Sequence, residues 1–281
     1  MTAFDLRPLT LGEILDRTFT LYRRNFLLFA GISAIPQTLV LAFNIIALLA
    51  GTRSGTRAFT GLGIGLGLII GFVVVVVWVL AIFFSQGATI LAVKDLYLGR
   101  TASIVDSFRR TRGEILPLIG VGMLIGLAVC FGLILLVFPG VFIACRLFVS
   151  VPVMLTEGRG PRDSLSRSWD LTKGAAGRAF VIYLLYIVIL FGLALLLVSP
   201  FSALAVLTGV RNPEMMRFWT FMADLGNRVS STLVSPFLLI ASAVFYFDLR
   251  VRKEAFDLQF MMDPESERIT GPSSSGLPSI L

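Results

Sequence analysis

Long apolar stretches separated by short polar connections make up most of this chain of 281 residues. A helix needs about 20 apolar residues to cross the hydrocarbon core of a bilayer, which is about 30 Å thick. Six stretches approach or exceed this length, so we predict spans near residues 26–50, within 61–93, and near 115–138, 141–156, 179–199 and 229–247. Strands are excluded because an open sheet cannot satisfy its backbone groups in lipid. The predicted fold is an all-α, polytopic helical membrane bundle.

Proline, glycine and polar residues suggest where these spans turn or end. Pro139-Gly140 predicts a tight turn between the third and fourth spans, and Pro200 is expected to end the fifth. The second stretch is longer than a bilayer requires, so it must tilt, kink or emerge near Ser85-Gln86. Asn212-Pro213-Glu214 predicts a separate helix on the outer side, before the sixth span.

The distribution of positive charge predicts the orientation. Eighteen lysines and arginines lie in the two termini and in the second-to-third and fourth-to-fifth connections, against five in the other three connections. Cytoplasmic loops carry the excess of lysine and arginine in membrane proteins. Both termini are therefore expected in the cytoplasm, which an even number of spans also requires. Residues 261–281 are rich in Ser, Gly and Pro and are predicted to form a disordered cytoplasmic tail after a membrane domain of residues 26–260.

The composition supports a location in the membrane and argues against catalytic and metal-binding sites. Hydrophobic residues make up 56% of the chain and charged residues 15%, whereas soluble domains carry about 25% charged residues. The net charge of +7 comes from clusters beside apolar runs, which is typical of contact with anionic lipid and not with nucleic acid. The chain contains no histidine, and Cys130 and Cys145 have no ligand spacing. We therefore predict no catalytic residue, no metal site and no cofactor.

A short repeat precedes three of the predicted spans. Residues 15–24, 104–113 and 165–174 share the pattern [LI]xx[ST][FW]xx[TY][KR][RG]. The first and fifth positions lie on one helical face, so each copy predicts an amphipathic helix in the cytoplasmic headgroup layer: one within residues 1–25, one near 99–113 and one near 160–174. The expected interfacial anchors are Phe19, Phe108 and Trp169. These helices either anchor the bundle or surround a site for an anionic headgroup or a partner protein.

Arg146 is the one clear charge inside the predicted spans, from which acidic residues are missing. Two interpretations remain open. Arg146 either reaches the outer surface or a structural partner, because it lies only six residues after Gly140, or it lines a polar cavity for an anionic headgroup, where Asn44 or Gln37 meets it. The candidate headgroup contacts, chosen for positive charge near a membrane surface or inside a span, are Arg23, Arg24, Arg112, Arg146 and Lys173.

Three stretches together resemble a bacterial family, the membrane domain found with some glycerophosphoryl diester phosphodiesterases and its stand-alone relatives. They are the opening LRPLTLGEILDR and LYRR within residues 6–24, the middle TEG and RSWDLTKG within 156–174, and the exit YFDLRVRKEAF at 246–256. The resemblance covers roughly residues 5–260 and implies a polytopic helical protein of the bacterial inner membrane. It supplies no catalytic residues, because the phosphodiesterase is a separate soluble barrel that uses histidine and metal-binding carboxylates.

Three functional hypotheses follow, in decreasing order of support. The first is a non-enzymatic membrane protein that acts as a scaffold or accessory factor in membrane lipid or envelope homeostasis, with membrane lipids and a protein at the cytoplasmic face as partners. The second is a transporter or lipid-handling carrier for an anionic substrate. The third, an enzyme acting on lipids, has the weakest support. The oligomeric state does not follow from the sequence.

Overall fold

The computed structural model describes residues 8–51, 61–209 and 212–254, and these ranges are helical apart from short connections. The helices are α1 (Leu11–Arg24), α2 (Phe26–Gly51), α3 (Gly61–Tyr97), α4 (Ile104–Leu135), α5 (Val137–Arg146), α6 (Ser150–Glu157), α7 (Pro161–Leu171), α8 (Ala176–Leu197), α9 (Ser199–Gly209) and α10 (Pro213–Glu254). Six helical segments are long and apolar enough to cross a membrane. The predicted all-α fold with six such segments is confirmed, while the tail of residues 261–281 lies outside the described residues.

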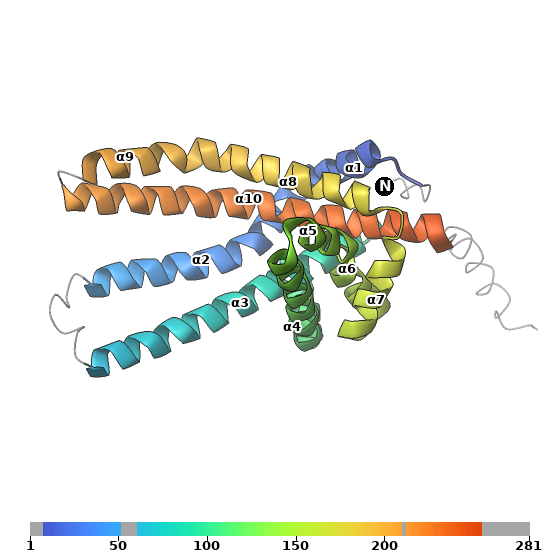
Figure 1. Cartoon of the computed structure of the whole chain (residues 1–281), viewed down its shortest axis with the longest axis horizontal. Coiled ribbons are helices and arrows are strands. Elements are labelled where there is room, and N and C mark those ends of the chain that lie inside the picture. The colour runs from blue at the N-terminus through green and yellow to red at the C-terminus, as the bar shows by residue number, and fades with distance from the viewer. Residues whose placement is uncertain (1–7, 52–60, 210–211, 255–281) are drawn as a thin grey trace, which may run out of the picture.

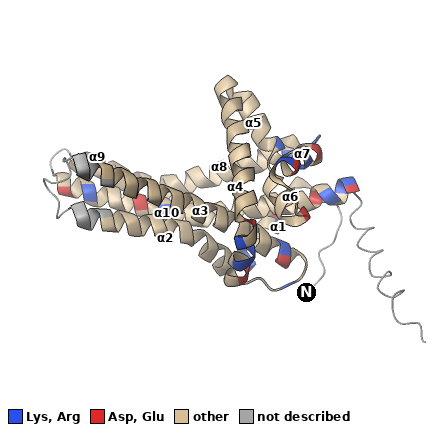
Figure 2. Cartoon of the chain, turned by 90° about the horizontal axis from the view of Figure 1, so that it is seen from below, with Lys and Arg blue, Asp and Glu red and all other residues tan. Residues whose placement is uncertain are grey.

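Most of the long helices share one direction. Figure 1 shows α2, α3, α8, α9 and α10 along the long axis of the molecule. The longest, α10, has 42 residues and is about 63 Å long at about 1.5 Å per residue. Figure 2 shows most charged residues at the end that carries α1, α6, α7 and the last turns of α10, and we call this the charged end. The opposite end, where α9 meets the start of α10, is the far end.

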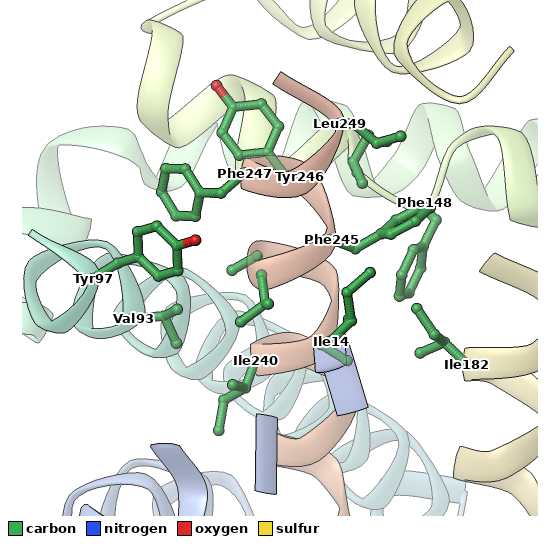
Figure 3. Close-up of a cluster of buried hydrophobic side chains, with 14 of the residues drawn as sticks. Ile14, Val93, Tyr97, Phe148, Ile182, Ile240, Phe245, Tyr246, Phe247 and Leu249 are labelled. Atoms are coloured by element: carbon green, nitrogen blue, oxygen red, sulfur yellow. The ribbon is translucent and has the colours of Figure 1, made fainter. Parts of the chain in front are cut away.

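The buried core lies toward the charged end. Every residue of α10 from 240 to 249 is buried, and Figure 3 shows side chains from α1, α3, α8 and the connection between α5 and α6 packed around this stretch. On α3, by contrast, most residues from 68 to 79 are exposed, among them Leu68 at 70% and Phe72 at 70%. Such apolar surface is stable only in hydrocarbon. The structure therefore combines a protein-packed end with helices that offer their apolar faces to lipid.

The third and fourth predicted spans differ from the structure in their boundaries. The segment predicted as a separate helix near 99–113 begins at Ile104 and continues into the span as α4, so no turn occurs at Arg112-Gly113. The chain turns at Leu136, which is extended with φ −167° and ψ 154°. Pro139-Gly140, the predicted turn, lies in the first turn of α5, where a missing proline N–H costs nothing. The fourth span is itself broken at residues 147–149 into α5 and α6.

Three other boundaries need correction or confirmation. The second predicted span continues as helix past Ser85-Gln86, because α3 runs unbroken to Tyr97. The fifth ends close to Pro200 as predicted, since α8 stops at Leu197 and α9 begins at Ser199. The outer helix predicted from Pro213 and the sixth span form one helix, α10, which keeps Pro236 inside it.

The repeat forms helices, and the face it buries within the protein is that of the hydroxyl side chains. The fourth position of the motif, [ST], is buried in all three copies, at 0–2% exposure, in Thr18, Ser107 and Ser168. Small hydroxyl side chains let helices approach closely, and each aromatic lies beside this face. Moreover, α1 runs antiparallel along α10: Leu9, just before α1, donates to Asp248, the Phe19 ring packs on Phe237 with centroids 4.8 Å apart, and the Tyr22 hydroxyl donates to the Leu233 carbonyl. In Figure 1, α7 lies across the long axis, as an interfacial helix would.

Candidate functional site

Asp248 is the centre of one polar network at the charged end. Its side chain is fully buried and binds Arg178 at 2.7 Å and Arg252 at 3.0 Å. The backbone N–H of Leu9 also donates to it, at 2.7 Å. Buried carboxylates are stable when opposite charges and hydrogen-bond donors satisfy them in this way. This network ties the start of the chain, α8 and α10 together.

Glu157, at the end of α6, is the centre of a second network. It accepts hydrogen bonds from the Tyr246 hydroxyl at 3.0 Å and from Arg159 Nε at 2.7 Å. Arg167 bridges Glu157 to Glu254. A third pair, Arg110 with Asp95 at 2.7 Å, links α4 to α3. Each of these carboxylates thus has a neighbouring arginine as its counter-ion.

Arg146 differs from these paired arginines. It is 6% exposed, and across residues 8–51, 61–209 and 212–254 no carboxylate forms an ion pair with it. Its Nε is buried without a hydrogen-bond partner. The guanidinium carbon lies 4.5 Å from the centroid of the Trp169 ring, a cation–π arrangement. The backbone carbonyl of Arg146 accepts hydrogen bonds from Ser168 and Thr172 of α7, both at 2.9 Å, so α7 holds the end of α5 in place.

Positive charge gathers around Arg146. Lys253 Nζ donates to the carbonyls of Asp170 at 2.7 Å and Lys173 at 3.2 Å, and so caps α7. Lys253 lies in the last turn of α10, beyond its apolar part. Partial burial lowers the pKa of Lys253, and the charges of Arg146, Lys173 and Arg167 lower it further, against an opposing effect of Asp170. An anion would relieve this repulsion. We call Arg146, Trp169, Lys173 and Lys253 the Arg146 cluster.

A second polar group lies between α2 and α10, toward the far end. Arg228 binds both carboxylate oxygens of Asp224, at 2.8 Å and 3.0 Å, and Asn44 Nδ2 donates to Asp224 at 3.1 Å. Beside it lies a cavity of about 220 Å³ that Gln37, Arg228 and Thr232 help to line. The expectation that Asn44 meets Arg146 is therefore wrong, because Asn44 binds Asp224, which lies in α10 just before the predicted sixth span.

Another cavity lies elsewhere on the molecule. It has a volume of about 630 Å³ and is formed by one face of α4, from Gly120 to Leu127, and by the start of α7, from Gly160 to Asp163. Its lining is mainly apolar on α4, whereas Arg162 and Asp163 supply charge on α7. Arg146 lines neither this cavity nor the one between α2 and α10.

The structure brings together part of the predicted set. Arg146 meets the anchor Trp169, and the exposed Lys173 joins the cluster through its backbone carbonyl, which binds Lys253, whereas Arg23, Arg24 and Arg112 are exposed on α1 and α4. The predicted outward path of Arg146 is not seen, since its neighbours belong to the charged end. Of the other two anchors, Phe19 is 48% exposed, and Phe108 is half-buried and packs on Phe84 with ring centroids 6.5 Å apart.

Sequence reasoning missed Lys253 and Asp224. No motif places Lys253 beside α7, because the two segments are 80 residues apart. Asp224 and Arg228, however, are four residues apart, a spacing typical of ion pairs on a helix. This spacing in the sequence already indicates that the two side chains pair. Within the described ranges no group of three or more Cys, Asp or Glu side chains forms a metal-binding cluster.

Comparisons with known proteins do not identify the chain: no family model matches it, and no curated protein or solved structure is significantly similar to it.

Proposed function

We propose that this chain is a non-catalytic integral membrane protein that binds an anionic lipid headgroup at the Arg146 cluster, and that it serves as a scaffold or accessory factor in membrane lipid or envelope homeostasis. One observation carries the proposal: Arg146 is 94% buried and lacks a counter-ion among the described residues.

The energetic argument concerns what compensates a buried guanidinium. Burying a charged group inside a protein costs several kcal/mol even after the protein relaxes around it. A cation–π contact with Trp169 contributes about 0.5–2 kcal/mol, which leaves a deficit. Guanidinium groups bind phosphate through two parallel N–H donors, so a phosphate headgroup would supply the missing partner. Lys173 and Lys253 add positive charge at the same place.

The proposed orientation places the charged end in the cytoplasm of a bacterial cell. The excess of lysine and arginine at this end supports it. The cytoplasmic leaflet carries anionic lipids, which attract basic groups near the membrane surface by about 1 kcal/mol for each lysine or arginine. The Arg146 cluster would therefore lie beside the leaflet that contains its ligand, with both termini inside the cell.

The chemistry of the charged end supports binding over catalysis. The whole chain lacks histidine, the commonest general acid and base in enzymes. Three carboxylates of the charged end, Glu157, Asp248 and Glu254, are each paired with arginine. We propose no reaction for this protein.

Native mass spectrometry with added phosphatidylglycerol and phosphatidylcholine tests the proposal. We expect the wild-type chain to retain phosphatidylglycerol preferentially and Arg146→Gln to lose about tenfold in affinity, equivalent to about 1.4 kcal/mol. The matched control is Arg162→Gln, which removes the same charge from the exposed start of α7 and is expected to bind normally. Equal retention by Arg146→Gln and wild type would refute the proposal.

A carrier for an anionic substrate is the second candidate. The paired charges of Asp224 and Arg228 and the cavity of about 220 Å³ between α2 and α10 favour it, because transporters place polar groups near broken or paired helices inside the membrane. A fluorescent anionic lipid reconstituted in proteoliposomes separates the two functions. Protein-dependent movement of the lipid between leaflets, lost in Asp224→Asn, would favour the carrier, and binding without movement would favour the scaffold.

A further inference from the structure

The hairpin formed by α4 and α5 stands away from the other long helices. Figure 2 shows both helices rising to the side, across the direction that α3 and α10 follow. Beyond α4, α5 contacts only α8 closely, whereas α4 packs on α3 at least as extensively as on α5 and also contacts α6 and α7. The hairpin is therefore joined to the bundle through α4, and α5 adds little contact with the other long helices.

The contacts between α4 and α3 show how the two helices cross. Thr111 and Leu118, seven residues apart on α4, both reach the small surface of Gly87 on α3, and Gly122 of α4 meets the ring of Phe83. From residue 111 to 122, α4 advances about 16 Å, whereas the matching stretch of α3 from 83 to 87 is about 6 Å long. Parallel neighbours would advance equally, so α4 crosses α3.

The length of α5 limits how far the hairpin tip can lie from the charged end. With ten residues, α5 extends about 15 Å, half of the hydrocarbon thickness of about 30 Å. It begins at the tip, after Leu136, and ends at Arg146 in the Arg146 cluster. The following helix, α6, finishes at Glu157, which binds Tyr246 at the charged end. Neither helix therefore brings the tip to the far end.

The surface of the hairpin nevertheless requires hydrocarbon. No charged residue occurs between Glu114 and Arg146. At the tip, residues 133–138 are all exposed, Ile134 by 84% and Phe138 by 82%. Water would penalise this surface at about 25 cal/mol for each Å² of apolar area. Only a position within one leaflet satisfies both the short reach of α5 and the apolar surface.

We infer that α4 and α5 form a re-entrant hairpin embedded in the leaflet next to the charged end, where it contacts the acyl chains of that leaflet. Four helical passages then cross the membrane, through α2, α3, α8 with α9, and α10. The partner is lipid acyl chain, because the tip offers no polar side chain that a protein partner could bind specifically. Both ends of the chain still lie on one side, and the inference does not depend on headgroup binding at Arg146.

Single-cysteine labelling with a membrane-impermeant maleimide tests this topology. In a Cys130→Ala/Cys145→Ala background, Leu136→Cys places one thiol at the hairpin tip, where the native side chain is 67% exposed and its loss disturbs little packing. Membrane vesicles of both orientations are labelled before and after detergent solubilisation. We expect Leu136→Cys to react from neither side of the membrane and to react fully in detergent.

Two controls define the sides. Glu214→Cys, at the far end, should react from one side only, and Ser103→Cys, at the charged end, from the other. Labelling of Leu136→Cys from the Glu214 side would show a pair of true spans, and labelling from the Ser103 side would place the hairpin in water. A disulfide-linked dimer of Leu136→Cys, formed in high yield in membranes, would show that the tip contacts a second copy of the chain. Each of these three results would overturn the inference.

Discussion

Arg146 and Arg228 are both largely buried arginines, but their electrostatic surroundings differ. Arg228 is 12% exposed, and Asp224 holds it through two oxygens while Asn44 supports the carboxylate. Arg146 is 6% exposed and has an aromatic ring where Arg228 has a carboxylate. A buried ion pair is complete without a ligand, whereas a buried unpaired charge is not. The difference indicates that Arg228 stabilises the fold and that Arg146 is held ready for an anion.

The largest expected effect on stability comes from Asp248, whose fully buried carboxylate pairs with two arginines. Asp248→Asn would leave Arg178 and Arg252 at the charged end without their shared negative charge. Breaking a buried pair from one side costs about 3–5 kcal/mol. We expect thermal unfolding in detergent to occur at a much lower temperature than in wild type. An unchanged unfolding temperature would show that these networks contribute little to stability.

A smaller loss is expected when Arg228 is made to resemble Arg146. Asp224→Leu removes the carboxylate and leaves a second unpaired arginine in the membrane region. Because Asp224 is 32% exposed, we discount the buried-pair value to about 1–3 kcal/mol. The double variant Asp224→Leu/Arg228→Leu should recover most of this stability, since apolar replacement of a whole pair is often neutral. Failure of the double variant to recover would indicate a role beyond charge balance.

Removing the charge of Arg146 should leave the stability of the protein unchanged in the absence of anionic lipid. We expect Arg146→Gln to unfold at the same temperature as wild type in neutral detergent, because no ion pair is lost. Added phosphatidylglycerol should stabilise wild type by RT ln(1 + [L]/Kd), about 2.7 kcal/mol at one hundred times Kd, and stabilise the variant by about 1.4 kcal/mol less. A strongly destabilised variant in neutral detergent would instead assign Arg146 a purely structural role.

The smallest effect is expected from the aromatic partner. Trp169→Leu keeps an apolar side chain at the interface but removes the cation–π contact, which contributes about 0.5–1 kcal/mol at a partly exposed site. Affinity for phosphatidylglycerol should fall by about threefold, and Trp169→Phe should fall less. A titration monitored by native mass spectrometry resolves this range. A loss of affinity as large as that of Arg146→Gln would mean that Trp169 positions the side chains of the cluster and contributes more than its cation–π contact.

The sequence predicts those features of the fold that depend on a single segment of the chain. The apolar stretches predict the six long helices because length and hydropathy are properties of each segment alone. The start of α1 also has a local signal, since Thr10 and Glu13 have the spacing of a capping box and form one in the structure. Pro139-Gly140 misleads because proline is tolerated both in a turn and in the first turn of a helix, and only the packing of α5 on α4 decides between them.

The parts of the site that sequence reasoning missed depend on distant segments. Arg146 is recognisable as a charge among apolar residues, but its burial depends on Ser168 and Thr172, more than twenty residues later, which bind its carbonyl. The same hydroxyl positions explain the repeat: the sequence shows a conserved spacing among three copies, and the folded chain shows that the spacing serves close helix packing. Lys253 enters the cluster only through the length and direction of α10.

The central claim is that an anionic headgroup completes the coordination of Arg146, and a cryo-electron microscopy structure in nanodiscs containing phosphatidylglycerol tests it most directly. The account predicts phosphate density within hydrogen-bond distance of the Arg146 guanidinium, beside Trp169 and within reach of Lys173 or Lys253. A map in which the guanidinium instead binds a carboxylate or backbone carbonyl of the protein, with no lipid density beside it, would contradict the account.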